Sequence, residues 1–201
     1  MTSKPNYVEL GNVQSFAWNI CDTYKGLALE DIKQAQHQAR LPYAVCALNV
    51  CGDLNIGVMM RNSVIMGAAE FIIVGRRQYD RRSTVGAQNY IPVHRVDGML
   101  DDSTVDPVVV LNVIEELNYT PVFVEQGGTD VRHYNFAKHH NRPFCLVFGN
   151  EGNGIPNNLL MHGDTISVRQ RGVLRSLNVS STSAIVLDHV VDYFESVGYS
   201  T

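Results

Sequence analysis

The balance of apolar and polar residues changes near Pro42. Residues 29–40 read LEDIKQAQHQAR, a polar segment rich in helix-forming residues, and predict a solvated helix with Ile32 turned inward. The helix ends before Pro42, because the residue that precedes a proline is pushed out of the helical region. We therefore interpret residues 1–41 as an N-terminal helical extension and residues 42–201 as the main domain.

In the main domain, short and nearly unbroken apolar runs alternate with segments of helical periodicity. The predicted strands are 43–49, 71–75, 121–124, 144–149 and 165–168, and the predicted helices are 55–69, 107–117 and 178–197. Strands that are buried on both faces read as continuous apolar runs, and the helices between them cover the sheet. The predicted fold class is α/β, with a mostly parallel sheet and helices on both faces.

The composition is that of an ordinary globular protein. Hydrophobic residues make up 45% of the 201 residues and charged residues 18%, which suits one well-cored domain and not a disordered chain. No apolar run approaches the roughly 20 residues of a membrane-spanning helix, and the first residues do not resemble a signal peptide. We expect a cytoplasmic protein with no membrane partner. Four cysteines without a Cys-x-x-Cys spacing predict reduced, buried thiols.

Three glycine-containing loops follow predicted strands, at residues 125–128, 150–154 and 169–172. Ligands of parallel sheets bind beyond the carboxyl ends of the strands, and glycine lets the backbone approach them closely. For any one of these loops taken alone, a tight turn is the favoured interpretation. The spacing G-x-x-G-x-G from residue 149, and the lack of a G-x-x-x-x-G-K-[ST] run, disfavour a dinucleotide-binding Rossmann enzyme and a P-loop ATPase.

Arginine clusters indicate a polyanionic ligand despite the net charge of −4. Arginines beside Tyr79 suit phosphate contact and base stacking, although a solvated loop with pairing to Asp80 is the alternative. The predicted RNA contacts are Arg76, Arg77, Arg81, Arg82, Arg171 and Arg175. No histidine or cysteine spacing matches a metal site, so we expect none.

Three segments, in order, resemble the motifs of the SpoU/TrmH branch of the SPOUT RNA methyltransferases. Residues 55–61 (NIGVMMR) resemble its first motif, residues 146–155 (LVFGNEGNGI) its second, and residues 168–180 (VRQRGVLRSLNVS) its third. The resemblance covers about residues 43–197. The RSLNV and YDRRSTVGA segments are most similar to eukaryotic-type tRNA ribose methyltransferases.

The resemblance implies a C-terminal trefoil knot and a homodimer with the active site near the subunit interface. It also implies that S-adenosyl-L-methionine binds in the knot, held largely by backbone groups. By position in the motifs, those groups belong to Gly149, Val168 and Leu177, with Glu125 and Gln126 nearby.

The resemblance assigns catalysis to Arg61, Asn55, Glu151, Ser176 and Asn178. A ribose 2′-hydroxyl is a poor nucleophile and needs positioning and a charge partner. Arg61 is the candidate, because an arginine on an otherwise apolar helix face costs energy unless something binds it. Asn55 also reads as the N-cap of its own helix, and Asn178 as that of the last helix. Glu151 is expected to orient Arg61 or a ribose.

The predicted function is methylation of a ribose 2′-hydroxyl in RNA, and in tRNA more than rRNA. Two alternatives stay open at this point. One is a non-catalytic RNA-binding protein that keeps the fold, and the other is a methyltransferase that acts on an RNA base.

Overall fold

The computed structural model describes residues 8–10, 13–15, 19–101 and 104–199. The strands are β1 (Val8–Leu10), β2 (Val13–Ser15), β3 (Leu41–Leu48), β4 (Ala68–Val74), β5 (Val93–Val96), β6 (Thr120–Asp130), β7 (Phe144–Phe148) and β8 (Asp164–Ser167). The α-helices are α1 (Leu29–Gln38), α2 (Asp53–Ile65), α3 (Arg81–Thr84), α4 (Pro107–Glu116), α5 (Asn157–Leu160) and α6 (Val179–Ser196). The 3-10 helix η2 (Ala87–Asn89) connects α3 to β5.

Six parallel strands form the central sheet, in the order β5-β4-β3-β7-β6-β8. All of β7 and residues 43–48 of β3 are buried, which explains why these strands read as unbroken apolar runs. The predicted α/β class and mostly parallel sheet are therefore confirmed.

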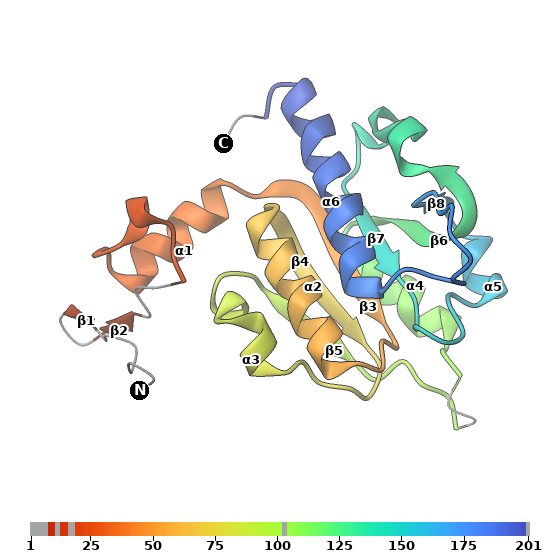
Figure 1. Ribbon diagram of the computed structural model, residues 1–201, viewed down its shortest axis with the longest axis horizontal. Helices are drawn as coiled ribbons and strands as arrows, with labels where there is room; N and C mark the ends of the chain where they lie inside the picture. Colours follow the sequence, from red (N-terminus) through yellow and green to blue (C-terminus); the bar gives the residue numbers. More distant parts are fainter. Residues whose placement is uncertain (1–7, 11–12, 16–18, 102–103, 200–201) are drawn as a thin grey trace.

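Helices cover both faces of this sheet (Figure 1). Side chains alternate across β3, so Val45 packs on the side of α2 and α6, whereas Cys46 packs on the side of α4 and α5. Phe194 of α6 stacks on Tyr43 and Phe144 at centroid distances of 6.0 and 6.1 Å. These two cores fix the sheet between its helix layers and so position the loops at its carboxyl edge.

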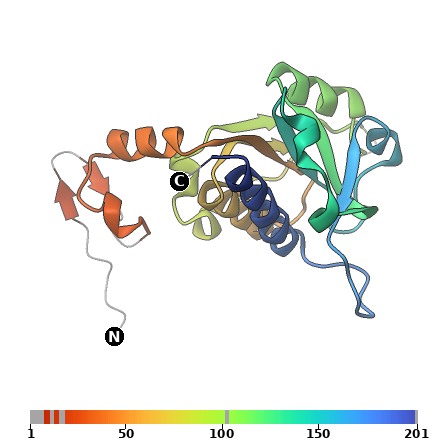
Figure 2. The same ribbon diagram turned by 90° about the horizontal axis from the view of Figure 1, so that it is seen from above.

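The N-terminal extension lies to one side of the sheet (Figures 1 and 2). It contains α1 and the antiparallel pair β1–β2, which was not among the predicted elements. Ile32 is the buried residue of α1, as predicted. The amide of Gln36 donates to the carbonyl of Val64 (3.2 Å), which ties α1 to the end of α2. The domain boundary at residues 41 and 42 stays a prediction.

Several boundaries differ from the sequence prediction. The helix predicted for residues 55–69 ends at Ile65, because Gly67 adopts a φ of +72° and β4 already begins at Ala68. The predicted elements include no counterpart of β5, α3 or α5. These elements are only four residues long, which is too short for a periodic pattern to emerge.

The four cysteines are free, but they are not all buried. Cys46 and Cys145 lie inside the sheet, as predicted for apolar runs. Cys21 and Cys51 are exposed, because they sit in the segments that precede η1 (Asp22–Tyr24) and α2, so the prediction is wrong for these two. Within the described ranges, no helix is both long and apolar enough to cross a bilayer.

Candidate functional site

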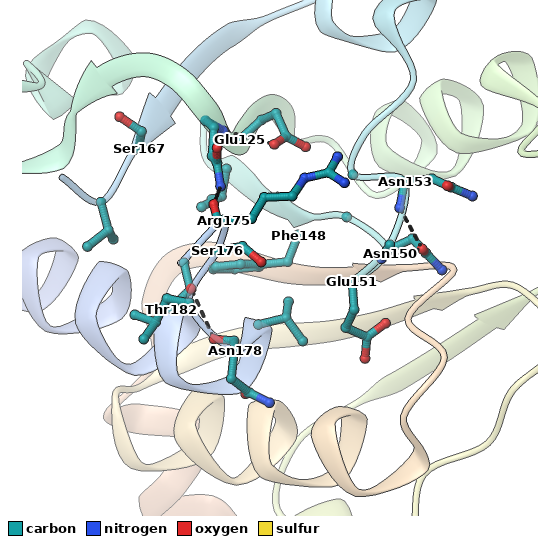
Figure 3. Close-up of a pocket in the computed structure, with 18 of the residues that line it drawn as sticks. Glu125, Phe148, Asn150, Glu151, Asn153, Ser167, Arg175, Ser176, Asn178 and Thr182 are labelled. Carbon is teal, nitrogen blue, oxygen red and sulfur yellow. Dashed lines mark hydrogen bonds between the residues drawn. The ribbon is translucent and has the colours of Figure 1, made fainter. Parts of the chain in front are cut away.

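A pocket of about 320 Å³ lies at the carboxyl edge of β6, β7 and β8 (Figure 3). Its volume is in the range of small-molecule sites. All five residues that were expected to hold the cofactor are in its lining: Glu125, Gln126, Gly149, Val168 and Leu177. The lining also holds Glu151, Ser176 and Asn178 of the predicted catalytic set. Among the residues that the structure describes, no group of three or more His, Cys, Asp or Glu side chains could hold a metal ion.

One wall of the pocket is a bulge inside β6. Val124 and Thr129 both face Ile166 of β8, so residues 125–128 bulge out between them. At Gly128 the chain passes so close to β8 that a Cβ atom would lie 2.6 Å from the neighbouring backbone. The predicted strand end at Val124 is therefore wrong, but the bulge still directs the expected residues into the pocket.

Glu125 and Gln126 connect this bulge to the other two loops. Glu125 Oε2 accepts a hydrogen bond from the Ile155 N–H (2.8 Å), in the loop after β7. Gln126 Nε2 donates to the Arg175 carbonyl (2.5 Å), in the loop before α6. The side chains predicted to bind the cofactor thus also hold the walls of the pocket together.

Glu151 connects the loop after β7 to the start of α2. Its carboxylate accepts hydrogen bonds from the N–H groups of Cys51 (2.9 Å) and Gly52 (3.2 Å) and from Asn55 Nδ2 (2.8 Å). Burial acts to raise the pKa of the Glu151 carboxyl, but these hydrogen bonds outweigh burial and hold the pKa below its ordinary value. Glu151 therefore places a negative charge at the N-terminus of α2, where the helix dipole favours it.

Asn55 and Asn178 extend this network to α6. Asn55 Oδ1 accepts a hydrogen bond from Asn178 Nδ2 (3.1 Å), and Asn178 Oδ1 accepts the Ser180 N–H (2.8 Å). Asn178 is the N-cap of α6, as predicted. Asn55 is not the N-cap of its helix, because α2 begins earlier, at Asp53, with Gly52 as its N-cap. Its side chain is free to bridge Glu151 and Asn178 instead.

We expect Asn178→Ala to lower the free energy of unfolding by about 1 kcal/mol, because α6 loses its N-cap. Asn178→Asp keeps the capping oxygen and loses only the amide that donates to Asn55, so it should retain most of that stability. Urea unfolding followed by circular dichroism measures both variants. An alanine variant as stable as the wild type would contradict the capping role.

Arg61 lies on the exposed side of α2, away from this network. Its neighbours along that side, Leu54 and Ile65, are 57% and 65% exposed. The structure places Arg61 outside the pocket lining. The helix face around Arg61 is thus apolar, as expected, but it is exposed. Glu151, which was expected to orient Arg61 or a ribose, forms hydrogen bonds with Asn55 and with backbone N–H groups.

The six arginines predicted to contact RNA fall into different environments. Arg175 lines the pocket and reaches across it toward the loop that carries Asn153 (Figure 3). Arg82 pairs with Asp80 (2.5 Å), as the alternative interpretation of that cluster expected, and Arg76 lies 3.9 Å from Asp97. The exposed side chains of Arg77, Arg81 and Arg171 have no carboxylate partner among the described residues. Only part of the predicted cluster is therefore available to a polyanion without breaking an ion pair.

Two residues at this edge were not singled out from the sequence. Asn150 Oδ1 accepts the N–H groups of Gly152 (2.8 Å) and Asn153 (3.0 Å), which shapes the loop after β7. Arg95, at the carboxyl end of β5, donates from Nη2 to the Arg77 carbonyl (3.3 Å). The FGNEGNG segment already contains Asn150, whereas Arg95 belongs to a strand that the apolar pattern did not indicate.

A parallel sheet with a ligand-sized pocket at its carboxyl edge, walled by glycine loops, defines an α/β domain that binds a small organic molecule. The chain belongs to the SpoU rRNA Methylase family, whose sequence model matches residues 42–188. The resemblance drawn from the three motifs is thereby confirmed.

A curated relative is the tRNA (guanosine(18)-2'-O)-methyltransferase TARBP1 of Mus musculus, which is 28% identical over 179 residues. The alignment covers 80% of this chain and 10% of the mouse protein, so the chain spans about a tenth of that relative.

Solved structures share the fold. The A. aeolicus TrmH/SpoU tRNA modifying enzyme is 21% identical with a TM-score of 0.68, and the match covers 86% of this chain and 87% of that one. The SpoU methyltransferase AviRb from Streptomyces viridochromogenes, in complex with the cofactor AdoMet, is 23% identical with a TM-score of 0.63. This second match covers 78% of this chain and 60% of the Streptomyces chain.

Proposed function

We propose that this protein is an S-adenosyl-L-methionine-dependent RNA methyltransferase that acts on a ribose 2′-hydroxyl, in tRNA more than rRNA. The observation that carries the proposal is the pocket at the carboxyl edge, which gathers all five predicted cofactor residues in one lining. Membership in the SpoU rRNA Methylase family and the AdoMet in the Streptomyces structure support the cofactor. The tRNA 2'-O-methyltransferase name of the mouse relative supports the substrate.

The pocket suits a ligand with a flat ring, whose faces can lie on apolar side chains, and with polar ends. Phe148, Val168 and Leu177 give it apolar surface, and Arg175 contributes a cation. At Gly149 a Cβ atom would lie 2.6 Å from the Ile155 side chain, so this position of the lining requires glycine. When bound, S-adenosyl-L-methionine supplies an electron-poor methyl group.

The residues of the chain must position the ribose hydroxyl and stabilise the charge that develops as its proton leaves. In this proposal Arg61 supplies that positive charge, directly or through the neighbouring phosphate, because an arginine stays protonated and is a poor base at neutral pH. Glu151, Asn55 and Asn178 are positioning residues, since their hydrogen bonds hold the loop after β7 against α2 and α6. Ser176 lines the pocket beside them.

A homodimer is part of the proposal. Leu54 and Ile65 expose apolar surface on either side of Arg61, and Ile185 of α6 is 38% exposed. Apolar surface that is exposed on two packed helices is typical of an interaction site. A dimer formed through this face would place Arg61 at the interface, where it could serve the pocket of the second copy. Sedimentation of Ile65→Asp beside the wild type tests this arrangement, since retention of the dimer would exclude this face.

The trefoil knot and a cytoplasmic location also belong to the proposal. The knot rests on the family resemblance. The two free cysteines buried in the sheet, Cys46 and Cys145, are consistent with a reducing compartment.

The arginines without a carboxylate partner should contribute most to RNA binding. Arg81→Ala is expected to weaken RNA binding about fivefold and to reduce the dependence of log affinity on log salt by about 0.7 to 0.9, because one phosphate contact is lost. Arg82→Ala is the matched control on the same helix, since its charge is already balanced by Asp80. Filter binding at several salt concentrations measures both effects. Equal losses for the two variants would contradict the distinction.

Transfer of a tritiated methyl group into total tRNA and rRNA, followed by nucleoside analysis, tests the function as a whole. We expect label in 2′-O-methylated nucleosides of the tRNA fraction. Label found only on bases would refute the ribose reaction and favour a base methyltransferase. Calorimetry that detects no binding at millimolar S-adenosyl-L-methionine would favour a non-catalytic RNA-binding protein.

A further inference from the structure

A second cavity, of about 520 Å³, separates α1 from the segment that leads into β5. One side is a single face of α1, with Glu30, Lys33, Gln34, His37 and, just beyond the helix, Arg40. The other side is Asn89, Tyr90, Ile91 and Pro92. This groove is at the amino edge of the sheet, whereas the cofactor pocket is at the carboxyl edge, so the proposed methyl transfer does not use it.

We propose that this groove binds a nucleotide of the RNA substrate, with a phosphate on Lys33 and Arg40 and a base stacked on Tyr90. The proposal rests on the RNA methyltransferase function given above. It assigns to the N-terminal extension a substrate-binding role that the pocket and the three motifs do not account for.

The cations of the groove can accept a phosphate. Among the described residues, Lys33 pairs only with Glu30 (2.8 Å), three residues earlier on the same helix. The side chains of Lys33 and Glu30 are 41% and 81% exposed. Such a surface pair contributes little free energy and can be exchanged for a phosphate at small cost. Arg40 donates from Nη2 to the Tyr90 carbonyl (3.3 Å). Its Nε is buried without a hydrogen-bond partner among the described residues.

Tyr90 provides the flat surface. Its ring is half-buried, and burial raises the pKa of its hydroxyl while the nearby charge of Lys33 acts in the opposite direction. The phenol is therefore neutral and lies close to a cation. An aromatic ring beside basic side chains is the arrangement that proteins use to bind single-stranded RNA, because every base has a face that can stack.

The groove shares two lining residues with a cavity beside the arginines of α3. A third cavity, of about 370 Å³, is lined by Arg81, Arg82 and Val85, and it shares Asn89 and Tyr90 with the groove. The segment from α3 to β5 returns from the carboxyl edge to the amino edge, as a connection between parallel strands must. An RNA strand that contacts Arg81 can therefore follow this segment to Tyr90.

The test compares two variants of the groove with a matched control. Lys33→Ala/His37→Ala removes side chains from the exposed face of α1, and Tyr90→Leu removes the stacking ring. Lys25→Ala is the control, since Lys25 belongs to the same extension and pairs with Asp22 three residues away, but lies outside the groove. Tyr90→Phe keeps the ring. Binding of unfractionated tRNA to the 201-residue chain is measured by filter binding at several salt concentrations.

We expect the double variant to bind tRNA about fivefold more weakly, with a salt dependence smaller by about 0.7. Tyr90→Leu should lose about fivefold or more, as expected for one stacked base, whereas Tyr90→Phe and Lys25→Ala should bind like the wild type. Affinity for S-adenosyl-L-methionine should not change in any variant, which also verifies that each one is folded.

The same samples keep the two hypotheses apart. A wild-type chain that transfers no methyl group refutes the proposed function, and with it the groove as a site for its substrate. If the wild type transfers methyl groups normally and both groove variants bind tRNA with unchanged affinity, the proposed RNA site in the groove is refuted, whereas the proposed methyltransferase function stands.

Discussion

Arg61→Ala is expected to reduce methyl transfer by a factor of about 100 to 1,000, the loss typical of removing one group that stabilises charge in the transition state. The affinity for S-adenosyl-L-methionine should stay close to that of the wild type, because Arg61 is exposed and outside the pocket lining. Stability should also change little, since surface substitutions of this kind usually have small effects. Single-turnover transfer and calorimetry measure the two properties separately.

Arg61→Lys is the informative second variant. A lysine keeps the charge but loses the planar group that binds a phosphate through two hydrogen bonds, so partial activity would indicate contact through a phosphate. Arg142→Ala is the control, as another exposed arginine that lies outside the pocket. Wild-type turnover in Arg61→Ala would refute the role that we propose for Arg61.

Gly149→Val is expected to weaken binding of S-adenosyl-L-methionine more than about 100-fold, because the added side chain does not fit unless the backbone of the pocket shifts. A Cβ atom at this position would lie 2.6 Å from Ile155 Cγ1 and 2.7 Å from the backbone of Gly154. Gly172→Val is the matched control, since Gly172 lies in a neighbouring loop and a Cβ atom there would meet nothing within 4 Å. Calorimetry measures both. Tight cofactor binding by Gly149→Val would contradict the position of the pocket.

The two impaired variants, Arg61→Ala and Gly149→Val, together test the proposed dimer. If Arg61 serves the pocket of the other subunit, a mixture of Arg61→Ala and Gly149→Val chains forms some dimers in which one site has both an intact pocket and an arginine. Activity should then reappear on mixing. If Arg61 acts within its own subunit, every site in the mixture lacks one of the two and the mixture stays inactive.

The sequence was most informative where burial is complete. Residues 43–48 and 144–148 are buried on both faces of the sheet, so their apolar runs identified the two central strands. The edge strand β5 reads VHRV and has no fully buried residue, so its pattern resembles that of a polar loop. The bulge in β6 escaped prediction because it depends on a contact with β8, which lies about 40 residues further along the chain.

The site was predictable as a set of residues but not as a geometry. The glycine loops and motifs located the cofactor residues, which the fold brings into one pocket. The partners of Glu151 were not predictable, because Asn55 lies 96 residues away and two of its hydrogen bonds come from backbone N–H groups, which sequence does not display. The exposure of Arg61 likewise depends on which side of α2 packs against α6.

The hydrogen bonds from Glu151 through Asn55 to Asn178 connect the loop after β7, α2 and α6. Thermodynamic linkage is reciprocal. If bound cofactor orders these elements and raises the affinity of α2 for RNA by some factor, bound RNA must raise the affinity for the cofactor by the same factor. The measurable quantity is a coupling free energy, obtained from cofactor affinities with and without RNA. Asn55→Ala, which removes the hydrogen bonds to both Glu151 and Asn178, should bring that coupling close to zero while leaving the two separate affinities largely in place.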